Sequence, residues 1–158
     1  MCDVGHVLHS RGDLDGALRK LREAERIYRE TLGDDHPKVA ECMKRIGSVL
    51  NDQDDLPAAL AAYREAERIV RAHFGDGHEE TAHAVSRVAL TLQFLGDHAG
   101  ALAKYLEAEQ IYRTAFGDID SGVAVCLNHL IDAHEAVGDT LAAEQCRTEA
   151  LHIWLKSG

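Results

Sequence analysis

Hydrophobic and polar residues alternate along most of the chain with the period of an α-helix. In the stretch 55–74 the apolar positions recur every three or four residues, at Leu56, Ala59, Leu60, Tyr63, Ala66, Ile69 and Val70. This spacing places them along one side of a helix, while Arg64 and Arg68 take the other side. The pattern predicts an amphipathic helix that buries one face against its neighbours.

The pattern returns every 42 residues. The segment 22–40 reads REAERIYRETLGDDHPKVA, 64–82 reads REAERIVRAHFGDGHEETA, and 106–124 reads LEAEQIYRTAFGDIDSGVA. Single positions line up in columns: Ala17, Ala59, Ala101 and Ala143; Ala24, Ala66, Ala108 and Ala150; Ile27, Ile69, Ile111 and Ile153. A fixed period of this length indicates a repeat array, in which each unit buries its apolar side by stacking on the next.

Each repeat is expected to contain two helices. The first helices are predicted at 1–10, 37–52, 79–95 and 121–137, and the second helices at 13–32, 55–74, 97–116 and 139–156. Glycines are expected to end three of the second helices, at Gly33, Gly75 and Gly117. Aspartates are the N-cap candidates of the second helices, at Asp13, Asp55, Asp97 and Asp139. Asp34, Asp35 and Asp76 offer carboxylates near the starts of two first helices.

Short connections predict antiparallel neighbouring helices and one domain without a linker. Its repeats are expected at 1–33, 34–75, 76–117 and 118–158, and the first repeat is shortened. Composition agrees with an all-α protein, because the chain has only two prolines, which break helix interiors.

With this register the chain resembles the tetratricopeptide repeat family, in the 42-residue subclass of the kinesin light chains. The small and large apolar residues of the family pattern stand at Ala40, Met43, Ile46, Gly47 and Leu50, followed by Ala59, Tyr63 and Ala66. The resemblance implies an all-α, right-handed solenoid of helix pairs that binds other proteins. The final repeat departs from the pattern at His134 and Arg147, where large apolar residues are usual, so we expect it to pack more loosely.

Charge and cysteine usage restrict the partners and the compartment. The formal net charge is −10, from 27 acidic and 17 basic residues, which opposes binding to nucleic acid or anionic lipid. No apolar run approaches the ~20 residues that span a bilayer, and the first residues do not form a signal peptide. The four cysteines (Cys2, Cys42, Cys126 and Cys146) form no CxxC pair. We therefore expect thiols in a reducing, cytoplasmic setting, with Cys42 and Cys126 used for packing.

In the resembled family the first helix of each pair lines the inner groove. The residues that this implies for the groove are Lys44, Arg45, Ser48, His83, Ser86, Arg87, Leu90, Asn128, His129 and Asp132. Lys44, Arg45 and Arg87 predict a peptide or helical partner segment that carries acidic residues. The alternative is that these side chains form only a solvated surface.

The kinesin light chain groove carries an asparagine pair, and of that pair only Asn128 is present here. A different alternative is that the flank of 1–10 and the end that carries Ile153 and Trp154 are covered, either by self-association or by the remainder of a longer protein of which this chain is a fragment.

Other chemistry finds little support in the sequence. Cys2, His6 and His9 share one helical face and could hold zinc, but no fourth ligand is placed, so solvated or capping histidines are the expectation. No catalytic or phosphate-binding motif is present, and the sequence predicts neither an enzyme nor a cofactor. The paired glutamates are interpreted as a solvated face, because they recur at one spacing: Glu23/Glu25, Glu65/Glu67 and Glu107/Glu109.

Overall fold

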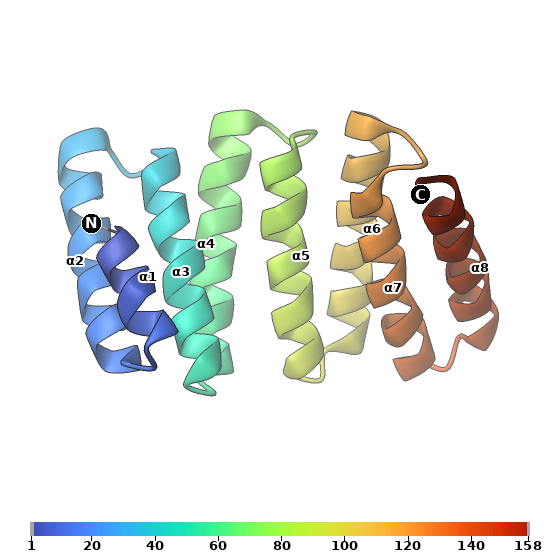
Figure 1. Ribbon diagram of the computed structural model, residues 1–158, viewed down its shortest axis with the longest axis horizontal. Coiled ribbons are helices and arrows are strands. Elements are labelled where there is room, and N and C mark those ends of the chain that lie inside the picture. Colours follow the sequence, from blue (N-terminus) through green and yellow to red (C-terminus); the bar gives the residue numbers. More distant parts are fainter. Residues whose placement is uncertain (1, 158) are drawn as a thin grey trace. The chain divides into compact units, whose positions relative to one another are not determined.

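The computed structural model describes the backbone of residues 2–157 and the side chains of residues 3–156. It contains eight α-helices in this part of the chain and no strand (Figure 1). In order they are α1 (Cys2–Ser10), α2 (Leu14–Leu32), α3 (Pro37–Asp52), α4 (Leu56–Phe74), α5 (Glu79–Phe94), α6 (His98–Phe116), α7 (Ser121–Ala136) and α8 (Thr140–Ser157). None of the described helices is long and apolar enough to cross a membrane.

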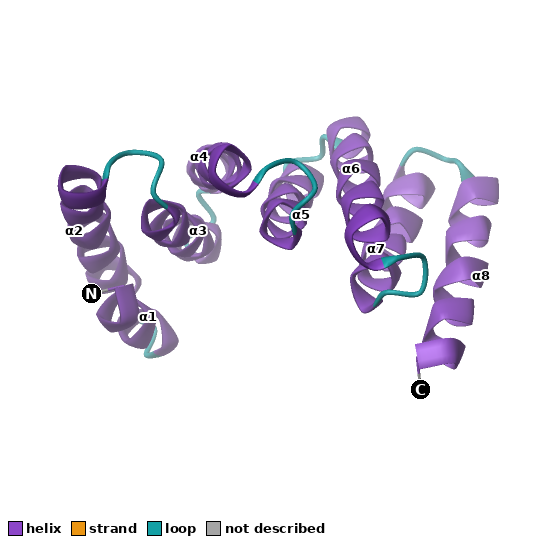
Figure 2. Cartoon of the chain, turned by 90° about the horizontal axis from the view of Figure 1, so that it is seen from above, coloured by secondary structure: helices purple, strands orange, loops and turns teal. Residues whose placement is uncertain are grey.

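The chain divides into two compact units, Met1–Gly75 with α1 to α4 and Asp76–Gly158 with α5 to α8. In the first unit α1 contacts α2 and α3, α2 contacts α3, and α3 contacts α4. In the second unit each helix contacts the next, from α5 to α8. Turns of three or four residues join consecutive helices inside each unit, and these helices run antiparallel (Figures 1 and 2). The predicted all-α helix pairs are confirmed.

The ends of the second helices follow the predicted chemistry. Side chains of Asp13, Asp55, Asp97 and Asp139 accept hydrogen bonds from backbone N–H groups three residues on, at 2.9, 3.2, 2.9 and 3.1 Å. These aspartates are therefore N-caps, and α2, α4, α6 and α8 begin one residue after them. Gly33, Gly75 and Gly117 follow α2, α4 and α6 with φ of +94°, +88° and +91°. Only glycine adopts this left-handed region without steric cost.

Two of the first helices, α3 and α5, are capped by histidines and not by the nearby aspartates. His36 Nδ1 accepts from the N–H of Lys38 at 3.1 Å, and His78 Nδ1 accepts from the N–H of Glu80 at 3.2 Å. The nearby Asp34 and Asp35 instead bind arginines, Arg29 at 3.3 Å and Arg68 at 2.7 Å. The histidines of these two turns thus have a structural role, as caps of α3 and α5.

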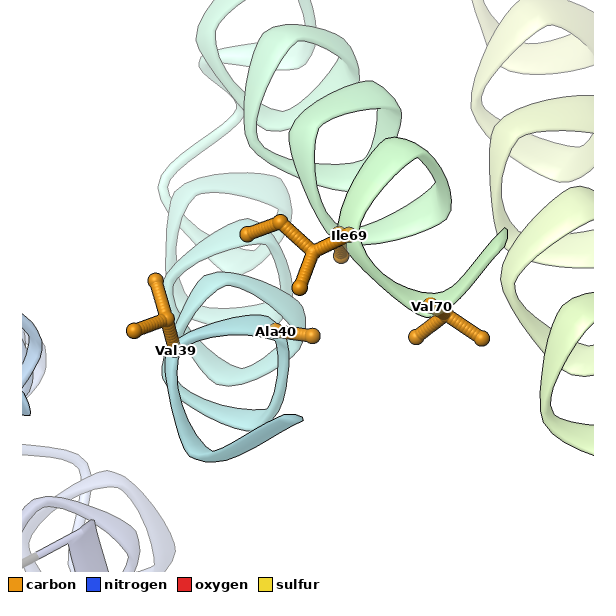
Figure 3. Packing of buried hydrophobic residues seen from close by; sticks show 5 residues of the cluster. Val39, Ala40, Ile69 and Val70 are labelled. Carbon is orange, nitrogen blue, oxygen red and sulfur yellow. The ribbon is translucent and has the colours of Figure 1, made fainter. Parts of the chain in front are cut away.

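The predicted columns of the repeat lie in the core. All eight alanines of the two columns are at most 3% exposed, and Ile69, Ile111 and Ile153 are at most 8% exposed. Ile27 is only half-buried and departs from its column. Figure 3 shows the packing in the first unit, where Ile69 of α4 points toward Ala40 of α3, and Val39 and Val70 belong to the same buried cluster. Equivalent positions therefore have equivalent surroundings in nearly every repeat.

The last repeat differs at the two positions where it departs from the family pattern. His134 is mostly buried, and its Nδ1 has no hydrogen-bond partner within the described residues, since Asp139 lies 3.8 Å away. Arg147 is half-exposed and pairs with Glu135 and Glu144. Looser packing of this repeat stays a prediction.

Cysteines Cys42 and Cys126 are buried at equivalent positions of α3 and α7, as the packing interpretation requires. Cys126 and Cys146 are free thiols. Cys42 is disulfide-bonded, so the expectation of a thiol is wrong at this position.

The paired glutamates are not a solvated face throughout, and this expectation needs correction. Arg29 of α2 binds Glu25, Asp34 and also Glu65 of α4, the last at 3.3 Å. Residues 84 positions later repeat the arrangement in the second unit, where Arg113 of α6 binds Glu109, Asp118 and also Glu149 of α8, the last at 2.7 Å. Glu67 is buried and binds Arg71 at 2.8 Å. One arginine in each unit thus ties successive second helices together.

Candidate binding site

The predicted groove residues fall on three helices. Lys44, Arg45 and Ser48 lie on α3 in the first unit. The others lie in the second unit: His83, Ser86, Arg87 and Leu90 on α5, and Asn128, His129 and Asp132 on α7. The two sets thus belong to different compact units.

On α3 the cations share one carboxylate. Glu41 binds Lys44 Nζ at 2.9 Å and Arg45 Nε at 2.8 Å. Burial disfavours the charged form of Glu41, but the hydrogen bonds and charges of Lys44 and Arg45 outweigh it and lower the pKa of this carboxyl. Glu41 is thus ionised at neutral pH and competes with any acidic partner group for both cations.

A hollow of about 290 Å³ lies between α5 and α7 in the second unit. Three predicted residues line it, His83, Ser86 and His129. The remaining lining comes from α5, α6, α7 and the turn before α7: Glu79, Tyr112, Phe116, Asp120, Ser121, Gly122, Val125 and Cys126. The structure therefore brings part of the predicted set together around a concave feature.

Tyr112 of α6 shapes one wall of this hollow. Its hydroxyl lies 3.0 Å from His83 Nδ1, and the two rings meet edge to face with centroids 5.7 Å apart. A Cβ atom at position 122 would lie 2.5 Å from the Tyr112 ring, so Gly122 is the residue that lets the ring pack against α7. Burial raises the pKa of the Tyr112 hydroxyl, which therefore remains protonated and able to donate a hydrogen bond.

His129 and Cys126 of α7 also line the hollow. The His129 ring stacks on Tyr105 with centroids 4.9 Å apart and planes 5° apart. Burial lowers the pKa of His129, and nearby Asp132 opposes this only in part. At neutral pH His129 thus offers a hydrogen bond and no charge. Burial also raises the pKa of the Cys126 thiol to about 11, which leaves it protonated and a poor nucleophile.

The other predicted residues of this unit lie on the same helices outside the lining of the hollow. Arg87, Asn128 and Asp132 are exposed, and Leu90 is half-buried. No ion pair involving Arg87 occurs among the described residues. Among the three cations predicted for the groove, Arg87 thus differs from Lys44 and Arg45, which both bind Glu41.

Metal chemistry gains no support from the described residues. No three side chains among His, Cys, Asp and Glu come together to hold an ion in the part of the chain that is described. His9 of the sequence-level zinc candidate pairs with Asp52, Nε2 to Oδ2 at 2.5 Å, and this contact ties α1 to α3. The Cys2 side chain lies outside the described residues.

Sequence reasoning missed the aromatic side of the hollow. Tyr112 belongs to a second helix, whose side chains we had assigned to the core and to solvent. One signal was present: the same column of the repeat holds large residues at Tyr28, Tyr112 and Trp154. Gly122 stands where the preceding repeat has Glu80, so this repeat carries no side chain at the position beside the ring.

A second hollow, which the sequence did not indicate, lies in the first unit and has a volume of about 650 Å³. Apolar residues of α3 and α4 form much of its lining, including Met43, Ile46 and Leu50. Arginines and glutamates of α2 form the remainder. None of the predicted α3 residues lines it.

An all-α chain built from helix pairs at a constant 42-residue spacing is a helical-repeat protein, the class whose members present helix faces to other molecules. The family model described as tetratricopeptide repeat matches residues 1–72 and 44–114. The chain belongs to this family, whose members generally act as scaffolds for protein–protein interaction.

Solved structures show the same fold at low sequence identity. BtubC (BKLC) from P. vanneervenii superposes with a TM-score of 0.89 at 19% identity, over 98% of this chain and 61% of that one. A putative kinesin light chain of Podosopora anserina, with nearly identical TPR-like repeats, gives 0.86 at 14% identity, over 98% and 73%. This chain thus spans less than two thirds of BtubC. No curated protein matches the sequence.

Proposed function

We propose that the protein is an interaction scaffold that binds a segment of a partner protein along the face formed by α5 and α7. The observation that carries the proposal is the hollow between these helices, lined by His83, Ser86 and His129. Binding sites are typically concave and combine apolar walls with a few polar groups, and this hollow has both. Four further predicted residues flank it on the same two helices.

The chemistry of this face favours a segment with an acidic side chain beside an extended or helical backbone. Exposed Arg87 offers a guanidinium that binds a carboxylate through two parallel hydrogen bonds. The exposed amide of Asn128 can donate to and accept from a peptide backbone. His129 adds a neutral hydrogen-bonding group, because its stacking on Tyr105 keeps it buried on one side.

The α3 residues Lys44, Arg45 and Ser48 form a separate part of the proposal. Their contribution is expected to be weaker, since Glu41 already occupies both cations. An acidic group of a partner must displace the Glu41 carboxylate before it can bind Lys44 or Arg45.

The proposal is tested by selecting binders from a random peptide library and measuring their affinity by calorimetry. We expect selected peptides to carry Asp or Glu, and Arg87→Glu to weaken them at least about tenfold, because a charge-assisted pair becomes a repulsion. Arg22→Glu is the matched control, since it makes the same charge change at an exposed arginine of α2. Lys44→Glu is expected to have a smaller effect than Arg87→Glu. Equal affinities for wild type and Arg87→Glu would refute the assignment of the site.

Self-association is the second candidate function, and the surface of α8 favours it. Leu141, Leu151 and Leu155 are 70%, 59% and 75% exposed, and Trp154 is 48% exposed. Ile153, which the sequence had suggested for this surface, is 1% exposed and belongs to the core. A cluster of exposed leucines on one helix is typical of a surface that another protein covers.

A further inference from the structure

The side of α8 that faces away from α7 is apolar and uncovered within the described residues. Ala143, Ala150 and Ile153 form the buried side of the helix. Leu141, Leu151 and Leu155 lie on the opposite side, all at least 59% exposed. Their spacing of ten and four residues keeps them within one stripe of an α-helix.

The repeat shows how unusual this stripe is. Leu151 and Leu155 occupy the positions that hold Glu109 and Arg113 in α6, 42 residues earlier. In α6 that arginine binds a glutamate of the following second helix, at 2.7 Å. A leucine pair cannot bind such a glutamate and would instead desolvate it, which costs free energy. A surface that covers Leu151 and Leu155 is therefore expected to be apolar where Glu149 meets Arg113 of α6.

We propose that this surface is the same face of a second copy, so that two α8 helices pack antiparallel across a two-fold axis at Thr148. The inference rests on self-association as the second candidate function. With the axis at Thr148, residues equally distant from it on either side meet across the interface. Leu141 then packs against the second copy's Leu155, and Glu144 faces the second copy's His152.

The side chains along the stripe fit this pairing. Leucines stand at both ends, and small Thr148 stands at the centre, where two helices approach most closely. Glu144 is exposed; one of its carboxylate oxygens binds Arg147 of the same helix, and the other can accept a hydrogen bond from exposed His152. The stripe from Leu141 to Leu155 is about 21 Å long, at 1.5 Å per residue. A patch that complements itself in this way forms a closed dimer.

Sedimentation equilibrium of the full chain, from low to several hundred micromolar, tests the pairing. We expect a monomer–dimer equilibrium, and the double variant Leu151→Asp/Leu155→Asp should raise its dissociation constant at least about tenfold. Leu106→Asp is the matched control, because Leu106 is an exposed leucine of α6 at the repeat position of Thr148. This control should dimerise like wild type.

The sedimentation results distinguish self-association in general from the specific pairing of two α8 helices. A wild-type monomer at every concentration overturns self-association, and the α8 pairing with it, but leaves peptide binding at α5 and α7 untouched. Association that the double aspartate variant leaves unchanged overturns the α8 pairing alone.

Cross-linking tests the position of the axis independently of any loss of stability. In a Cys146→Ser background, Thr148→Cys places one thiol of each copy beside the two-fold axis. We expect it to form a disulfide-linked dimer under mild oxidation much faster than Leu106→Cys in the same background. Equal rates for the two variants overturn the antiparallel pairing at Thr148.

Discussion

At the scale of single residues, the environment of each side chain follows from its column in the repeat. Cys126 illustrates this rule. It stands 42 residues after Ala84, and both side chains are 1% exposed. A thiol in this column serves as a small apolar group, and burial raises its pKa from 9.0 to about 11. The same burial that makes Cys126 a packing residue also keeps it from acting as a nucleophile beside His129.

The raised pKa of Cys126 predicts a loss of stability in alkali. Because the unfolded chain releases this proton near pH 9.0 and the folded chain only near 11, the stabilising effect of the neutral thiol is present below pH 9.0 and is lost above it. The free energy of unfolding of wild type, relative to Cys126→Ala, should fall by about 2 kcal/mol by pH 11. Chemical denaturation at a series of pH values measures this difference.

The Cys126→Ala variant serves as the control, because the preceding repeat has alanine, Ala84, at this position. Other alkaline groups titrate equally in both proteins. A difference that does not change between neutral pH and pH 11 would contradict the burial of the thiol.

At the scale of the helices, caps fix where each element begins, and arginine networks hold successive second helices in register. Arg113 joins Glu109 of its own helix to Glu149 of α8, and Arg29 joins Glu25 to Glu65 of α4 in the same way. Both arginines are largely buried at the side chain, 20% and 27% exposed. Water therefore screens these pairs less than it screens a surface ion pair.

A double-mutant cycle measures the coupling between Arg113 and Glu149. Arg113→Met, Glu149→Gln and the double variant should give an interaction free energy of about 1 kcal/mol, since the pair is short and partly buried. The comparison pair is Arg26–Glu30, which is 65% and 59% exposed and should give about 0.3 kcal/mol. Urea denaturation of the two cycles at low salt provides both values. Equal coupling in the two pairs would mean that Arg113 does not tie α6 to α8.

At the scale of the whole molecule, the constant period accounts for most of what the sequence predicts. It places the eight helices to within one residue at nearly every end, because the same alanines and glycines mark each turn and core position. The hydrogen-bond and ion-pair partners of polar side chains in the turns are harder to predict. His36 and His78 cap their helices while Asp34 and Asp35 bind arginines, and nothing in the local sequence ranks these alternatives.

The lining of the hollow is only partly predictable from the sequence, for a related reason. The repeat identifies the exposed side of α5 and α7 and so predicts His83, Ser86 and His129, which line the hollow. It does not show that a Tyr112 ring packs beside Gly122 and borders a hollow there, because that depends on a contact between two helices. The arginine networks join residues 36 positions apart, and this spacing becomes meaningful only once two second helices are known to be neighbours.

The most direct test of the central claim is to map a bound peptide by NMR. Amide chemical shifts of the labelled protein are recorded while a library-selected acidic peptide is titrated. We expect the largest changes on α5 and α7, around Ser86, Arg87, Asn128 and His129. Changes confined to the outer faces of α2 and α4, or to α8, would contradict the proposed site.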